Sequence, residues 1–231
     1  PSSANGVNPA NFIAGDILTL DDVKTVETTN HIIATSPISL VTGSLKYNDK
    51  TALPTLFGTY PTILDAIQII TLDKGSFFSS NNSGNVIVLG QNTMNDLFDA
   101  DVDPIGKKIT LGKDEFTVIG TLGKSKSSGL FGSEFDALSM IPFDTAKRLN
   151  KDEIKIFRIV AKADDAANIG DIRQSIKNAL LTNHGGEDNF TVLTQDDLLG
   201  LFNTFLNLAT TMVSAIAAIS LIVGGIGIMN I

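Results

Sequence analysis

The 231-residue sequence predicts an α+β fold in which a mostly β section interrupts a discontinuous α/β domain and a long helix follows. Three observations predict it. Strand-like and helix-like patterns alternate on both flanks, in residues 1–74 and 151–193. Short β-branched runs separated by turn clusters fill residues 75–150 between them. Residues 194–231 carry a capped and almost wholly apolar helical pattern.

The first flank begins with an arm rich in Ser, Asn and Pro. Thr19-Leu20-Asp21-Asp22 then fits the capping-box pattern and predicts a short helix that ends near Asn30. Strands and one more short helix are expected after it. These expected segments are a strand at 32–41, where Pro37 favours an edge or a bulge, a hairpin turn at 43–49, a strand at 53–58, a helix at 62–67 and a strand at 69–72.

The middle section has the strongest hairpin signal of the chain. Gly112-Lys113-Asp114 lies between two runs rich in β-branched residues, which predicts an antiparallel pair. Short helices separate the other strands of this section. The expected strands are 85–89, 107–111, 115–122 and 137–141, and the expected helices are 91–98 and 143–149.

The second flank is dominated by one amphipathic helix at 164–181. Its apolar residues recur at intervals of three and four, at Ile169, Ile172, Ile176 and Leu180, so this helix is expected to cover a sheet. Strands are expected on both sides of it, at 154–161 and 190–193.

The C-terminal part begins with a second capping-box pattern, Thr194-Gln195-Asp196-Asp197. No charged residue follows from Leu198 to Ile231. Because about 20 apolar residues cross a bilayer as a helix, this stretch is long enough for a transmembrane segment. We expect one unbroken stalk helix that runs from the aqueous domain into the membrane. Since no charge or turn signal closes the segment at Ile231, we expect it to be truncated.

Two sets of residues on this helix are candidate contact sites. An apolar stripe is assigned to coupling or dimer contacts: Leu201, Phe202, Phe205, Leu208 and Met212. Small residues four apart are assigned to helix packing in lipid: Ser214 with Ala218, and Ser220 with Gly224. Two alternatives stay open, since the stripe could pack on its own domain and the whole helix could be the core of a soluble protein. Glycines near the end of the run disfavour the second alternative.

Composition excludes several classes of function. The net charge of -8 and the pI of about 4.6 argue against nucleic-acid binding. The chain has no cysteine, and its two histidines, His31 and His184, are expected to be turn or surface residues rather than metal ligands. Gly123-Lys124-Ser125 lacks the first glycine of a phosphate-binding loop, and no G-x-S-x-G elbow occurs. We therefore expect no catalytic, cofactor or metal site, and no enzyme activity.

Several short motifs follow one another along the chain. They are Leu18-Thr19-Leu20-Asp21-Asp22-Val23, Lys74-Gly75-Ser76-Phe77-Phe78, Val86-Ile87-Val88-Leu89-Gly90, Asp103-Pro104-Ile105-Gly106-Lys107, Phe116-Thr117-Val118-Ile119-Gly120, and the terminal block at 219–230. In this order they resemble the extracytoplasmic core domain of MacB-type ABC transporter permeases, which belong with the FtsX-like permeases. The resemblance covers nearly the whole chain. The family commonly has an arginine where this chain has Ser76.

The resemblance implies an organisation and a function. Residues 1–74 and 151–193 would form a porter-like α/β subdomain, and residues 75–150 an inserted, mostly β subdomain called Sabre in this family. The chain would be a non-catalytic permease part in the cell membrane, with residues before about 205 on the extracytoplasmic side. Its stalk would transmit the ATP-driven motion of a separate ATPase to an outer domain that binds a substrate or partner, for export or mechanotransmission. ATP would be bound by that ATPase subunit and not by this chain.

The implied partners are the ABC ATPase subunit, a second permease copy in a homodimer, the membrane, and an extracytoplasmic adaptor or substrate protein. Three alternatives stay open. A lipoprotein-releasing permease of related fold would share the same motifs. A membrane-anchored sensor or binding module would need no ATPase. An exported hydrolase is the least favoured, because no catalytic constellation is visible.

Overall fold

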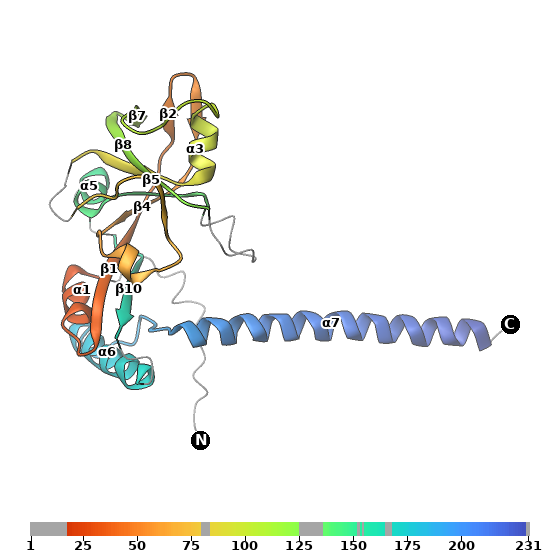
Figure 1. Ribbon diagram of the computed structural model, residues 1–231. Helices are drawn as coiled ribbons and strands as arrows, with labels where there is room; N and C mark the ends of the chain where they lie inside the picture. The colour runs from red at the N-terminus through yellow and green to blue at the C-terminus, as the bar shows by residue number, and fades with distance from the viewer. Residues whose placement is uncertain are drawn as a thin grey trace. The chain divides into compact units, whose positions relative to one another are not determined.

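The computed structural model describes residues 18–79, 84–124, 136–151, 153, 155–164 and 168–229 (Figure 1). At Leu201 and 224–229 only the backbone is described. The chain divides after Thr191 into two units. The first unit contains every described strand, and the second contains a single helix.

Strands make up the centre of the first unit. They are β1 (Ile32–Val41), β2 (Leu45–Tyr47), β3 (Lys50–Ala52), β4 (Thr55–Thr59), β5 (Leu72–Gly75), β6 (Val86–Leu89), β7 (Lys108–Leu111), β8 (Asp114–Leu122), β9 (Leu138–Pro142) and β10 (Arg158–Ala163). The helices are α1 (Leu20–Glu27), α2 (Ile63–Ala66), α3 (Gln91–Leu97), α5 (Phe143–Leu149), α6 (Ile169–Asn183) and α7 (Gln195–Met229).

All ten strands belong to one mixed sheet. Its order is β10-β1-β4-β9-β6-β8-β7-β2-β3, and β5 pairs with β8. The pairs β4/β9 and β6/β8 are parallel, whereas the other pairs are antiparallel. The predicted α+β class is therefore confirmed. Strands of the first flank pair directly with strands of the middle section, as β4 does with β9 and β2 with β7, so the sheet is continuous between them. The division at residues 74 and 150 into two subdomains stays a prediction.

Helices lie close to both faces of this sheet. On one face α5 packs against β4 at Gly58, where an added Cβ would stand only 2.0 Å from the Cβ of Ala146. On the other face α2 brings Ile63 against Ile38 and Met140 in a buried apolar cluster. Glycine at position 58 is thus a packing requirement, because any side chain there would push α5 off the sheet.

The helices α1 and α6 pack against each other at one end of the unit (Figure 1). In α1 the apolar side chains of Val23 and Val26 are buried. In α6 the buried residues are Ile172, Ile176 and Leu180, which is the stripe that the sequence predicted. The helix begins later than predicted, at Ile169.

Two predicted strands are wrong. Residues 69–72 were expected to be extended, but Ile70 N–H donates to the Ile67 carbonyl at 3.2 Å in a turn, and β5 starts only at Leu72. Residues 190–193 form no strand in the described part of the chain. There Phe190 is buried by packing its ring on His184, with 5.1 Å between ring centroids, so its apolar character serves a side-chain contact and not a strand ladder.

Two further segments were displaced. The expected turn at 43–49 contains strand β2, and the actual hairpin turn uses Asn48, whose φ of 51° suits a short polar side chain. The strand predicted at 154–161 is β10, which starts at Arg158; residue 154 lies outside the described residues.

Pro37 is not on an edge strand, since β1 pairs with β10 and β4, but the pairing with β4 begins only at Ile38. Proline is tolerated there because no neighbour on that side requires its missing N–H.

Candidate coupling site

The predicted capping box at the start of α7 is formed. Thr194 donates to Asp197 Oδ2 through its backbone N–H at 2.8 Å and through its hydroxyl at 2.9 Å. Asp197 N–H donates to Thr194 Oγ1 at 3.2 Å. The two free backbone amides are satisfied, and Asp196 and Asp197 place negative charge at the positive end of the helix dipole. The start of α7 is thus fixed locally.

From this cap α7 continues unbroken for 35 residues to Met229, a length of about 52 Å. The stretch Gln195–Val223, 29 residues, is the one helix of the described chain that is long and apolar enough to cross a membrane by length and composition. The prediction of one continuous helix at 194–231 is therefore confirmed as far as Met229.

The predicted stripe lies on one face of α7. At about 100° per residue, its members fall within an arc of about 120°. Phe205, Leu208 and Met212 are 64%, 55% and 57% exposed, and Phe202 is half-buried. The side chain of Leu201 lies outside the described residues. The helix thus brings the stripe together, while its role in coupling or dimer contacts stays a prediction.

The small residues predicted for helix packing are also on α7. Ser214, Ala218 and Ser220 are exposed, and the Ser220 hydroxyl donates to the Ile216 carbonyl one turn earlier at 2.9 Å. Such a bond satisfies the hydroxyl within its own helix, which suits an apolar surrounding. Gly224 lies where only the backbone is described, and the packing role of all four residues stays a prediction.

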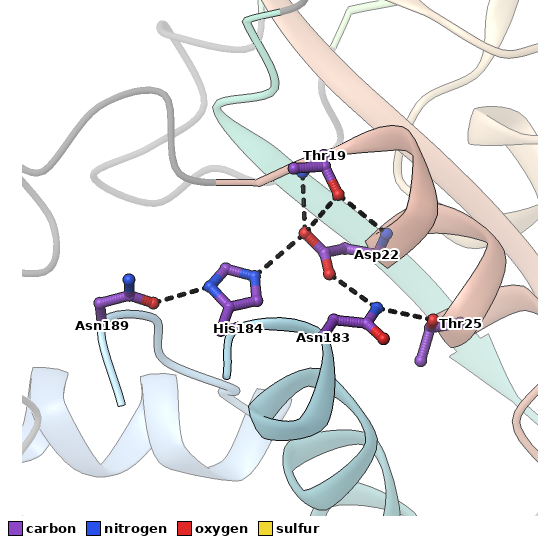
Figure 2. A network of polar contacts seen from close by, with 6 residues as sticks. All are labelled: Thr19, Asp22, Thr25, Asn183, His184 and Asn189. Atoms are coloured by element: carbon purple, nitrogen blue, oxygen red, sulfur yellow. Dashed lines mark hydrogen bonds and ion pairs between the residues drawn. The ribbon is translucent and has the colours of Figure 1, made fainter. Parts of the chain in front are cut away.

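A polar network at the base of α1 was not predicted as a unit (Figure 2). Its centre is Asp22, which closes the capping box of α1: Thr19 donates to Asp22 Oδ2 from its N–H at 2.8 Å and from its hydroxyl at 2.9 Å. The side chain of Asp22 has no solvent exposure. A carboxylate buried to this degree requires further partners.

Those partners come from the end of α6 and the segment after it. Asn183 donates to Asp22 Oδ1 at 2.9 Å and to Thr25 Oγ1 at 2.8 Å. His184 Nε2 contacts Asp22 Oδ2 at 3.1 Å, and its Nδ1 contacts Asn189 Oδ1 at 2.9 Å. We call Thr19, Asp22, Thr25, Asn183, His184 and Asn189 the Asp22 network. Its bonds join α1 to the end of α6 and to Asn189, which precedes α7 in the sequence (Figure 2).

Asp22 is held in its ionised form. Burial raises the pKa of its carboxyl, but hydrogen bonds from Asn183, Thr19 and His184 together outweigh burial and hold the pKa below the ordinary 3.8. An ionised carboxylate only accepts hydrogen bonds, so Nε2 of His184 is the donor in their contact. The bonds that Asp22 accepts are therefore charge-assisted, and such bonds are stronger than bonds between neutral groups.

His184 lies in the turn that follows α6, as the sequence predicted, but its side chain is not at the surface. Its side chain is only 8% exposed, because Phe190 covers the ring and Asp22 supplies a buried acceptor. His31 does lie in a turn, with φ of 68°, and pairs with Asp164 at 3.0 Å at a half-exposed position. Among the described residues no group of three or more His, Asp or Glu side chains is placed to hold a metal ion.

The comparisons with known proteins decide the family. Residues 2–179 match the family model described as the MacB-like periplasmic core domain. This chain belongs to that family. The resemblance seen in the sequence is confirmed, and the MacB-like domain is accordingly the periplasmic domain of an ABC transporter permease, with one apolar helix at its C-terminal end.

Relatives of the MacB-like domain are much longer proteins. A "Macrolide export ATP-binding/permease protein MacB" from Neisseria meningitidis is 30% identical over 217 residues, which are 93% of this chain and 33% of that protein. One from Rhodospirillum rubrum is 31% identical over 232 residues, 99% of this chain and 35% of that protein. The chain thus spans about a third of the length of the curated relatives it matches.

Two solved structures share the fold. The periplasmic region of MacB from Actinobacillus actinomycetemcomitans superposes with a TM-score of 0.73 at 20% identity, covering 87% of this chain and 89% of that one. The extracellular domain of the transporter YknZ from Gram-positive bacteria gives 0.65 at 18% identity, with coverage of 81% and 91%. At these identities the likeness supports the fold of the MacB-like domain.

Proposed function

We propose that this MacB-like domain works mechanically: ATP-driven motion of membrane helices reaches it through α7 and changes a surface that binds a substrate or a partner. In this proposal residues 1–74 and 151–193 form a porter-like base, and the Sabre-like section at 75–150 carries the moving surface. The domain itself performs no catalysis and holds no cofactor. ATP is bound by a partner ATPase or by an ATP-binding part of the same protein.

The observation that carries the proposal is the continuity of α7. Leu208 to Met229 are 22 residues that extend about 33 Å, enough for a hydrocarbon core of about 30 Å. Gln195 to Asn207 are the remaining 13 residues, which extend about 20 Å beyond it. Because no break separates the two parts, a shift or tilt of the membrane part displaces the capped start of the helix.

The Asp22 network supplies a firm attachment for such a displacement. Asn189 precedes Gln195, the first residue of α7, by six positions, and the network joins Asn189 to α1 through His184 and Asp22. A pull on the chain before α7 is therefore resisted by the hydrogen bonds between Asn189 and His184 and between His184 and Asp22. This supports transmission into the first unit.

The names of the relatives suggest what is moved. They are called macrolide export ATP-binding/permease proteins, so a macrolide is the first substrate to test and export the first direction. We further propose a homodimer in the membrane, with the stripe of Phe202, Phe205, Leu208 and Met212 at a dimer or coupling contact, and an extracytoplasmic adaptor protein as a further partner.

The test compares stalk variants of the full-length permease with its ATP-binding component in lipid. Phe202→Asp/Phe205→Asp places two charges on the stripe. Asn203→Asp/Asn207→Asp places the same charges on another side of the same helix segment, and so is the matched control. The proposal expects macrolide-stimulated ATP hydrolysis to fall at least about tenfold in the first variant only, while ATP binding and expression stay unchanged in both.

Equal stimulation in the wild type and both variants would contradict the proposal. In that case α7 is only an anchor, and a membrane-anchored sensor or binding module becomes the better hypothesis. Stimulation by a lipoprotein, and not by a macrolide, would keep the mechanical coupling but assign the chain to the lipoprotein-releasing type.

A further inference from the structure

An apolar recess of about 110 Å³ opens on the sheet face under α2. Its walls come from the strands β1, β4, β9 and β10, from α2 and from the turn that follows α2. The lining residues are Ile38, Phe57, Thr59, Ile63, Ile67, Ile70, Leu138, Met140, Arg158 and Val160. Eight of these ten are hydrocarbon or thioether side chains, so the interior favours an apolar group.

The sheet register fixes the floor of the recess. Ile38 of β1 pairs with Arg158 of β10 on one side and with Thr59 of β4 on the other. Residues paired across neighbouring strands point to the same face, so Arg158, Ile38 and Thr59 form one row. Thr59 is buried and its hydroxyl lies 2.7 Å from that of Ser36, whereas Arg158 is exposed on β10, which ends the sheet on this side.

The roof is made by three isoleucines. Ile63 lies in α2 and is buried, and the chain turns after the helix so that Ile67 and Ile70 also face the recess. The recess is small and its roof and floor are apolar, so it suits a compact apolar group better than a long chain.

Arg158 gives the recess one positive charge. Within the described part of the chain, no carboxylate pairs with its guanidinium; the recorded contact is with the ring of Phe157, 5.4 Å from the centroid. Other cations of the first unit do have such partners, for instance Arg148 with Asp114 at 2.9 Å and Lys108 with Glu115 at 2.7 Å. A cation beside an apolar cavity and without an acidic partner is complementary to an anion with an apolar tail.

From these features we propose that the recess binds a small monocarboxylate with a compact branched tail, the tail under α2 and the carboxylate on Arg158. The size decides the tail, because an apolar cavity of about 150 Å³ holds benzene, so about 110 Å³ holds a group the size of isobutyl. This site is independent of the proposed stalk coupling. Binding at the recess and coupling through α7 are therefore tested by separate experiments, and either can fail without the other.

Methionine methyl groups are suitable reporters for the test. Met140 lines the recess, Met94 packs in a different apolar cluster, and Met212 lies on α7. The complete chain is labelled with ¹³C-methyl methionine, placed in lipid nanodiscs and titrated with 4-methylpentanoate. We expect a saturable shift of the Met140 methyl signal, while the Met94 and Met212 signals stay fixed.

Two comparisons isolate the charge. 4-Methylpentanamide has the same tail without the negative charge, and is expected to bind about tenfold more weakly because a charge-assisted bond is lost. Arg158→Gln should reduce binding of the carboxylate to the level of the amide. Lys162→Gln removes a charge from the same strand outside the recess, and should leave the affinity unchanged.

Three results would overturn the proposal. They are the absence of a Met140 shift with either compound, equal affinity for carboxylate and amide in the wild type, and an equal loss in the Arg158→Gln and Lys162→Gln variants. The last would mean that the net charge of the domain, and not Arg158, attracts the anion.

Discussion

The capping boxes of α1 and α7 have the same local geometry and different surroundings. In both, the threonine N–H and hydroxyl donate to the aspartate at 2.8 and 2.9 Å, and the aspartate N–H donates back at 3.2 Å. Asp22 is completely buried, but Asp197 is only partly so. Asp22 also accepts bonds from residues 161 and 162 positions away.

The difference shows how one local motif can serve two purposes. At α7 the box starts a helix through the bonds between Thr194 and Asp197. At α1 the same box is one part of a tertiary contact, since the carboxylate that caps the helix also receives Asn183 and His184. Removing the aspartate should therefore have unequal consequences at the two sites.

The largest effect is expected for Asp22→Ala. This change removes the cap and leaves Asn183 and His184 without their buried acceptor, which should lower the free energy of unfolding by about 3 kcal/mol. Tyr47 and Tyr60 are the chain's two tyrosines, and it has no tryptophan, so urea unfolding followed by tyrosine fluorescence reports on the first unit. Asp197→Ala should change this signal by less than about 0.5 kcal/mol. Equal losses in the two variants would mean that the caps are equivalent.

A smaller effect is expected for His184→Gln, about 1.5 kcal/mol, because the ring contact with Phe190 and one charge-assisted bond are lost. His31→Gln is the matched control. Its pair with Asp164 is half-exposed and screened by water, so the loss should stay below about 0.5 kcal/mol in the same unfolding measurement. A loss at His31 as large as that at His184 would contradict the assigned importance of the network.

The smallest effect is a dependence on pH. The pKa of Asp22 is lower in the folded chain than its ordinary 3.8, so the folded state binds this proton less readily than the unfolded state. The resulting stability is fully present above about pH 4 and is lost as the pH falls through the folded pKa. Wild-type urea midpoints should therefore fall more steeply below pH 4 than those of Asp22→Asn. Parallel curves would show that Asp22 does not contribute.

Local patterns in the sequence predicted the local elements well. The hairpin of β7 and β8, the stripe of α6 and both capping boxes depend on residues within one or two turns or on a short loop. The apolar stripe of α7 and the first residue of that helix could be predicted for the same reason. Family motifs then extended the prediction to the transporter class, because they recur in a fixed order along the chain.

Contacts between distant segments could not be predicted. Nothing near His184 in the sequence indicates that Asp22 would be its partner, so this histidine was expected only to be a turn or surface residue. Phe190 was expected in a strand for a related reason, since an apolar residue in an extended context gives the same signal whether it meets a ladder or a histidine ring. The recess under α2 depends on the register of four strands, which single segments do not specify.

Because β1 pairs with β10, the sheet can be completed only after β10 has reached the same compartment as β1. Ile32 pairs with Ala163, 131 positions later, and Asp22 meets its partners later still. A periplasmic domain is delivered across the membrane as an extended chain, with its earlier residues first. β1 thus reaches the periplasm long before β10, and α1 before the end of α6. The domain can therefore complete its sheet only after Ala163 has crossed, and folding dominated by such distant pairings is slow. We therefore expect β1 to remain without one of its two neighbouring strands until β10 has been delivered.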